Sequence, residues 1–179
     1  MRNCLAPMLA LPLLLSLAAC GGGEPASGGD EARATPLSGR QETADGTASL
    51  VLPEGFVKTA YELDGQVTFA AQDALDPLRQ VFVTTGDSIA DAEAEAIFVA
   101  DVYVKKGATC HRDRTDTTFG ATHSIVDCRW KGKQPTHSVM VALGDTERGA
   151  MVLLSAPGRT RADVASFVTP VLDSWTWLD

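Results

Sequence analysis

Two cysteines and three histidines in the C-terminal half of this 179-residue chain are the residues best suited to chemistry. Cys110 and Cys128 flank or neighbour His111, His123 and His137. Redox-active pairs usually have C-x-x-C spacing, and zinc sites have short fixed spacings that this stretch lacks. We therefore expect a structural disulfide, with a redox pair or free thiols as alternatives. We expect no metal site, and we place the histidines on the surface or at sheet edges.

Hairpin geometry supports the disulfide. If residues 108–115 and 121–131 pair around a turn near Phe119, Cys110 lies opposite Cys128. A disulfide that closes this loop would stabilise the fold by about 3 kcal/mol in the loop-entropy account. The same register predicts an apolar face beside Cys128 and a polar face with three members: His123, Asp127 and Arg129.

The chain lacks a recognisable catalytic set. It has no G-x-S-x-G motif and no convincing Ser, His and Asp combination. Three carboxylates lie near His111 and His123, but carboxylates near histidines are common on solvated sheet faces. They are Asp113, Asp116 and Asp127. We therefore expect a protein that is not an enzyme and needs no cofactor, with a hydrolase as the least favoured alternative.

A basic segment stands out in an acidic chain. The formal net charge is -8, which disfavours binding to nucleic acid and to anionic lipid headgroups. Residues 111–118 alternate in charge, as solvated edge strands often do. With the cations that follow, this segment could receive an acidic protein partner, and four residues are candidates for that contact: Arg112, Arg114, Arg129 and Lys131.

The first nineteen residues have the composition of a secretory signal. Met1-Arg2-Asn3 supplies a positive start, an apolar stretch follows, and small residues precede Cys20. The alternative is a transmembrane anchor. The apolar stretch is shorter than the roughly 20 residues that span a bilayer, and Pro7 and Pro12 interrupt it. A cleaved signal peptide over residues 1–19 is the better interpretation.

Leu17-Ala18-Ala19-Cys20 resembles the lipobox of bacterial lipoproteins. The resemblance implies cleavage before Cys20, acylation of its thiol and amine, and attachment to a membrane through the lipid. Gly21, rather than Asp, follows Cys20, which favours the outer membrane, facing the periplasm, over the inner membrane. Cys4 then leaves with the signal, so Cys110 and Cys128 remain as a pair in an oxidising compartment.

The rest of the chain divides by composition. Residues 20–46 hold the acylated cysteine and a stretch with one large aliphatic side chain, Leu37, which predicts a flexible linker. Residues 47–179 are globular in pattern, and a composition of 45% hydrophobic and 21% charged residues suits a single domain.

Within this domain the pattern alternates between strands and helices. The mid-chain helix is expected at 89–106 and the last helix from Thr160 onward. Consecutive strands with tight turns predict an α+β fold, an antiparallel sheet of six to seven strands with both helices on one face. The expected strands are 48–52, 56–61, 66–72, 80–85, 108–115, 121–131, 136–144 and 149–155.

Both helices show apolar stripes and end signals. Ser88 with Asp91 predicts the first N-cap, Gly107 the C-cap, and Thr160 with Asp163 the second N-cap. The stripe expected to face the core is Ala90, Ala94, Ile97, Phe98 and Val102 in the first helix. In the second helix it is Val164, Phe167, Val168, Val171, Leu172 and Trp175, with a kink or a tightened last turn at Pro170.

The opening Ser49-Leu50-Val51-Leu52-Pro53-Glu54-Gly55-Phe56, the order of elements, and the ending Leu172-Asp173-Ser174-Trp175 resemble the PsbP/DcrB-like family over residues 48–178. The resemblance implies an α-β-α sandwich and a non-catalytic role in binding or assembly. We therefore expect a binding or assembly module of the cell envelope. The alternative is an immunity lipoprotein that neutralises a periplasmic toxin by protein–protein binding.

Overall fold

The computed structural model describes residues 35–59 and 67–179. The predicted signal peptide, Cys20 and the turn expected at Asp64-Gly65 lie outside these residues. Within them the chain forms two helices and ten strands, so the α+β prediction is confirmed. None of the helices in the described ranges has the length and apolar content that a membrane span needs.

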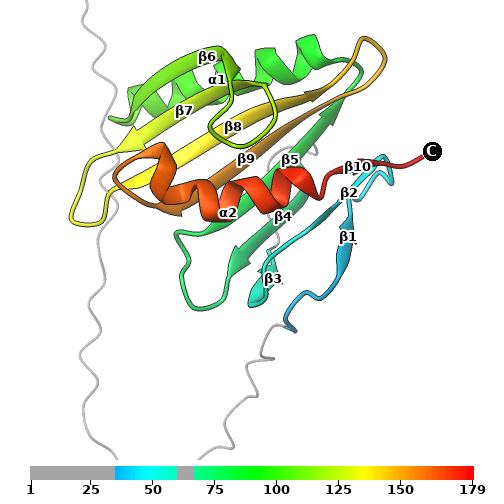
Figure 1. Ribbon diagram of the computed structural model, residues 1–179, viewed down its shortest axis with the longest axis horizontal. Helices are drawn as coiled ribbons and strands as arrows, with labels where there is room; N and C mark the ends of the chain where they lie inside the picture. The colour runs from blue at the N-terminus through cyan, green and yellow to red at the C-terminus, as the bar shows by residue number, and fades with distance from the viewer. Residues whose placement is uncertain (1–34, 60–66) are drawn as a thin grey trace, which may run out of the picture. The chain divides into compact units, whose positions relative to one another are not determined.

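A seven-stranded antiparallel sheet forms the centre of the fold (Figure 1). Its strands lie in the order β3-β4-β5-β9-β8-β7-β6, so β3 and β6 are its two edges. Their bounds are β3 Phe56–Lys58, β4 Val67–Asp73, β5 Gln80–Gly86, β6 Thr109–Asp116, β7 His123–Trp130, β8 Thr136–Gly144 and β9 Gly149–Pro157.

A second sheet joins the two ends of the described chain. Strands β1 (Arg40–Glu42) and β10 (Thr176–Trp177) pair antiparallel with opposite sides of β2 (Ala48–Val51). The linker boundary at residue 46 was therefore wrong, because β1 lies before it and Leu37 packs against the core. Strand β10 was not predicted, since its two residues are too short to show a pattern.

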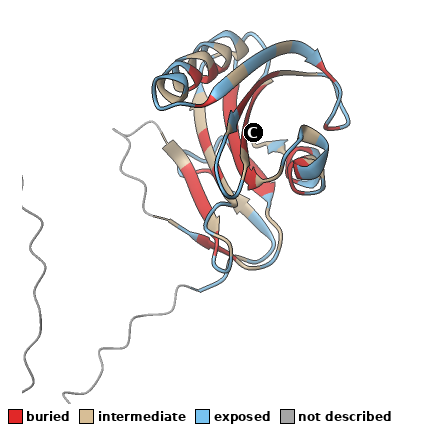
Figure 2. Cartoon of the chain, turned by 90° about the vertical axis from the view of Figure 1, so that its left-hand side faces the viewer, coloured by how far each residue is buried: buried red, intermediate tan, exposed pale blue. Residues whose placement is uncertain are grey.

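The helices lie on opposite faces of the large sheet (Figure 2). Helix α1 (Ile89–Lys105) packs on β5 to β9, and helix α2 (Arg161–Asp173) packs on β9 and β2. The prediction that both helices cover one face was wrong. Each face of the sheet carries its own apolar cluster, and a sheet buried on both faces needs a cover on both.

Helix α1 presents to the sheet a different face from the one predicted. Its buried residues are Ala92, Ala96 and Ala100, whereas Ala94 and Phe98 of the expected stripe are exposed. Alanines allow the helix to approach the sheet closely, and large side chains on that face would hold it away. The predicted ends are confirmed, because the Ser88 side chain accepts the amide of Asp91 and Gly107 has a φ of +99°.

Helix α2 follows its prediction closely. The hydroxyl of Thr160 accepts the Asp163 amide, and the Asp163 carboxylate accepts the Thr160 amide, which completes a capping box. The five apolar residues of the predicted stripe that lie within the helix are all buried. Pro170 lies inside the helix, which ends at Asp173, so Trp175 lies beyond its end.

The β6–β7 hairpin has the predicted register. Cys110 pairs with Cys128, and a disulfide joins them with the Cα atoms 4.0 Å apart. The face expected to be polar is not solvated. Ile125 and Asp127 of that face are buried, because α2 covers it. The turn residue Phe119 is fully buried in the same cluster.

Candidate functional site

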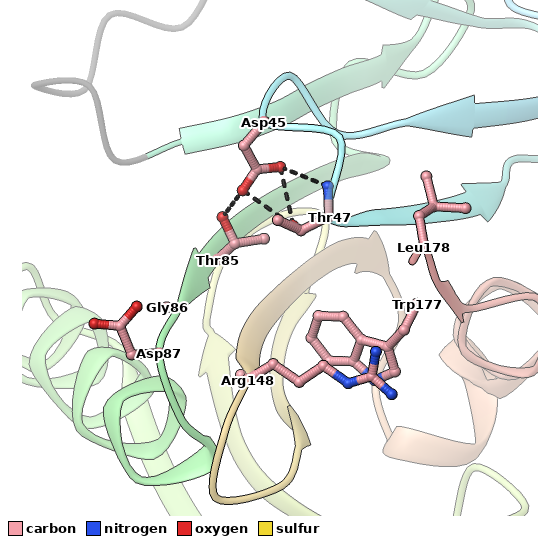
Figure 3. A pocket seen from close by; sticks show the side chains of 9 residues that line it. Asp45, Thr47, Thr85, Gly86, Asp87, Arg148, Trp177 and Leu178 are labelled. Atoms are coloured by element: carbon pink, nitrogen blue, oxygen red, sulfur yellow. Dashed lines mark hydrogen bonds between the residues drawn. The ribbon is translucent and has the colours of Figure 1, made fainter.

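An open cleft of about 280 Å³ lies at one end of the large sheet (Figure 3). Four segments far apart in sequence line it: the β1–β2 turn, the end of β5, the β8–β9 turn and the C-terminal strand β10. Their residues in the cleft are Asp45, Thr47, Thr85, Gly86, Asp87, Arg148, Gly149, Trp177 and Leu178. The volume is near the lower limit of ligand-binding pockets, which suits a small ligand or the end of a chain.

Asp45 is a fixed anion on one wall of this cleft. It accepts hydrogen bonds from the Thr47 amide and hydroxyl and from the Thr85 hydroxyl. Partial burial opposes ionisation of Asp45, but the hydrogen bonds from Thr43, Thr85 and Thr47 outweigh it and lower its pKa below 3.8. A carboxylate so occupied is a poor general base, because a catalytic base needs a pKa nearer the working pH.

Arg148 and Trp177 form the opposite wall. The guanidinium carbon lies 5.1 Å from the centre of the indole ring, a cation–π distance, and Figure 3 shows the two groups stacked. Nε of Arg148 lies 3.8 Å from the carboxylate of Asp145. Within the described residues, neither terminal nitrogen of Arg148 has a hydrogen-bond partner. The side chain is therefore oriented by the indole and still has donors to offer.

Glycine at position 149 allows the segment between β5 and α1 to lie close to the start of β9. Gly149 pairs with Gly86 across β5 and β9, and a Cβ at position 149 would collide with the carbonyl oxygen of Ser88. The chain leaving β5 for α1 therefore passes directly over the start of β9. This close passage positions Asp87 and Arg148 at the same end of the sheet.

A second open groove of about 370 Å³ lies between the ends of β4 and β5 and the first turns of α1. The two share Thr85 and Gly86 but lie on opposite faces of the sheet, because Thr85 points to the α2 side, where it bonds Asp45, and Thr84 points to the α1 side. Threonine hydroxyls line this groove, and Asp91 and Glu95 of α1 border it. One carboxylate oxygen of Asp91 accepts the Ser88 hydroxyl.

A buried group of charged side chains lies under the start of α2. Arg161 contacts Asp116 and Asp127, and Nδ1 of His137 lies 2.8 Å from the other oxygen of Asp127. The expectation that His137 is a surface histidine was wrong, since it is 4% exposed. Its Nε2 is buried without a hydrogen-bond partner in the described part of the chain. No solvent reaches this nitrogen, so the group holds α2 to the sheet rather than contacting a ligand.

The four cations predicted to bind a partner do not share a face. The register places Arg112 opposite Val126 on the α1 side of the sheet, whereas Arg129 lies opposite His137 on the α2 side. Arg112 also pairs with Glu93 of α1 at 3.2 Å. Arg114 and Lys131 are exposed near the same edge. A partner that contacts all four must wrap around edge strand β6.

Sequence reasoning missed the cleft, although a signal for it exists. Asp45-Gly46, Gly86-Asp87 and Gly144-Asp145 are turn dipeptides, and antiparallel strands bring alternate turns to the same end of a sheet. The pairing of β2 with β10, which brings Trp177 there, has no such signal. Among the described residues, no three His, Cys, Asp or Glu side chains are placed to share a metal ion.

Comparisons with known proteins bear on the fold. No family model matches the chain, and no curated protein matches it. A Bacteroides thetaiotaomicron crystal structure matches 78% of the chain at 10% identity with a TM-score of 0.50, and the chain spans about half, 48%, of that protein. A Mog1 structure matches 81% of the chain and 97% of its own at 13% identity, with a TM-score of 0.52.

The solution structure of the cyanobacterial PsbP (CyanoP) of Synechocystis is also similar. It matches 86% of the chain and 98% of its own length at 12% identity, with a TM-score of 0.49. The family expected from sequence therefore appears among the similar structures, together with Mog1. The likeness is one of fold alone.

Proposed function

We propose that this chain is a membrane-anchored periplasmic lipoprotein that acts as a non-catalytic binding module of the cell envelope. The observation that carries the binding role is the cleft of Figure 3, in which Asp45 is saturated with hydrogen bonds while Arg148 keeps free donors. Such a site can hold a ligand but offers no poised acid, base or nucleophile. The fold shared with Mog1 is compatible with this role.

Location and partner belong to the same proposal. The lipobox-like Leu17-Ala18-Ala19-Cys20 supports attachment through lipid to the outer membrane, facing the periplasm. The cations Arg112, Arg114, Arg129 and Lys131 near β6 support an acidic protein as the partner, with no role for nucleic acid. A toxin neutralised by this lipoprotein remains the second candidate for that partner.

The test is a cross-linked pull-down from detergent-solubilised envelope. We expect the native chain to recover one stoichiometric protein, and its identity separates an assembly partner from a toxin. A Cys20→Ser variant should lose its acyl chains, measured by intact mass, and leave the membrane fraction. Recovery of no specific protein, or membrane attachment that persists in the Cys20→Ser variant, would contradict the proposal.

A further inference from the structure

Helix α1 carries a second apolar stripe, which the fold leaves uncovered. Its largest member is Phe98, whose side chain is 64% exposed. Phe98 lies two positions from both Ala96 and Ala100, which are buried against the sheet, so at about 100° per residue it points away from the sheet. Ala94 lies one turn before it and Val102 one turn after it, on the same side of the helix. A continuous apolar stripe on the surface indicates a contact with another molecule.

Opposite charges lie at the two ends of this stripe. Asp91 precedes Phe98 by seven residues and Lys105 follows it by seven, which is close to two helical turns in each direction. Both side chains are exposed, and in the described part of the chain Lys105 has no ion-pair partner. We call these five residues the outer stripe: Asp91, Ala94, Phe98, Val102 and Lys105.

The outer stripe has the same spacing in both directions. Its steps are three, four, four and three residues, so a two-fold axis at Phe98 places it against an antiparallel copy of itself. In that arrangement Asp91 faces Lys105 of the second copy, and Ala94 faces Val102 of the second copy. A parallel arrangement would bring Asp91 to Asp91 and Lys105 to Lys105, which repulsion between like charges disfavours.

We propose that α1 joins two copies of this chain in a weak antiparallel dimer, with Phe98 at the two-fold axis and Asp91–Lys105 ion pairs at both ends. The chain has a net charge of -8, so its copies repel each other, and they can meet only where the surface is locally balanced. The outer stripe has this property, since it carries one anion and one cation. Glu95 and Asp101 lie on its two flanks, at the rim of the contact.

The small size of the contact sets the strength of the dimer. One helix from each copy buries less than the roughly 800 Å² per partner of a standard stable interface. We therefore expect a monomer in dilute solution and a dimer where copies are concentrated. The proposal goes beyond the proposed binding function and does not depend on it.

The first test is sedimentation equilibrium of the mature chain, purified in density-matched detergent, at concentrations up to millimolar. We expect a reversible equilibrium between monomer and dimer. Phe98→Ala should weaken the association at least about tenfold, because both copies lose the aromatic side chain at the centre of the contact. Leu75→Ala is the matched control: Leu75 lies in the β4–β5 turn, is 93% exposed, and should be replaceable without effect on the association.

Charge reversal tests the ends of the contact. Lys105→Asp or Asp91→Lys alone places like charges opposite each other at both ends and should weaken the association about tenfold. The double variant restores the two ion pairs and should recover most of the loss. Urea denaturation of each variant verifies that it folds.

Cysteine cross-linking tests the orientation. Phe98→Cys should give a disulfide-linked dimer under mild oxidation, whereas Val104→Cys, which is exposed but about 120° around the helix from Phe98, should not. Asp91→Cys and Lys105→Cys should cross-link when both are present in one chain, but neither should do so alone. In an antiparallel pair the two copies of position 91 lie about 21 Å apart along the helix axis. Intact mass after proteolysis verifies that Cys110 and Cys128 remain joined.

Three results would overturn the proposal. One is a monomer throughout the sedimentation series. The second is a dimer that Phe98→Ala weakens no more than Leu75→Ala does. The third is efficient cross-linking of Asp91→Cys alone, which would require parallel helices. Each of these results leaves the envelope pull-down unaffected, so failure of the dimer and failure of the binding function can be told apart.

Discussion

At the scale of single residues, the buried charges under α2 differ most from expectation. Asp116 and Asp127 share Arg161, and Asp127 also contacts His137. Sequence reasoning placed Asp127 on a solvated face because a strand pattern shows alternation but not what covers each face. Burial of Asp127 is possible because Arg161, which lies in α2 in a distant part of the chain, supplies the counter-charge.

Arg161→Met should lower the free energy of unfolding at neutral pH by about 3 kcal/mol, since it leaves two buried carboxylates without their cation. Urea denaturation followed by circular dichroism measures the change. The exposed neighbour Arg159→Met is the control and should stay within about 0.5 kcal/mol of wild type. Equal effects of the two substitutions would mean that the buried ion pairs do not contribute to the free energy of unfolding.

Asp163 predicts a dependence of stability on pH. Hydrogen bonds from the Arg159 and Thr160 amides lower the pKa of its exposed carboxyl below 3.8. A lowered pKa stabilises the fold above pH 3.8, and the contribution disappears as the pH falls through the folded-state pKa. The unfolding midpoint of Asp163→Asn should therefore lie below that of wild type at neutral pH and converge with it in acid. A difference between the two unfolding midpoints that does not change with pH would contradict a lowered pKa for Asp163.

At the scale of elements, the sequence predicted where helices and strands lie better than which way they face. The caps at Ser88 and Thr160 and the disulfide register at Cys110 depend on local spacing, and the structure has them. The buried face of α1 was missed because apolar residues lie on both of its sides. A periodicity argument follows the larger side chains, such as Phe98, while tight packing selects the alanines.

Two leucine substitutions in α1 test this orientation. Ala96→Leu should lower the free energy of unfolding by about 1–3 kcal/mol, because Ala96 is 2% exposed against the sheet and has no room for a larger side chain. Ala94→Leu, on the exposed side of the same helix, should change it by less than about 0.5 kcal/mol. Alanine and leucine have similar helix propensities, so the difference reports packing. A larger loss for Ala94→Leu than for Ala96→Leu would instead support the face of α1 that was predicted from sequence.

At the scale of the whole molecule, the least predictable feature is the pairing of β2 with β10. The Leu178 amide donates to the Thr47 carbonyl oxygen, and the indoles of Trp175 and Trp177 pack edge to face. Contacts between positions so far apart carry no local signal, so the α+β class could be predicted but this sheet, and the cleft that it completes, could not.

A chain that ends at Ser174 should lose about 2 kcal/mol or more of unfolding free energy, because it lacks β10 and two half-buried indoles. Thermal or urea unfolding measures the loss, with a chain that ends at Leu178 as the control. A truncated chain as stable as the control would mean that β10 does not contribute to the free energy of unfolding.

The disulfide between Cys110 and Cys128 also bears on how copies of this chain meet. Strand β6 is an edge, and an edge hairpin can open at its turn and exchange strands with a second copy. The covalent link between β6 and β7 ties the two strands together, so the segment 117–122 cannot serve as the hinge of such an exchange. Oxidation thus closes one route to a domain-swapped dimer while leaving the edge open to other partners.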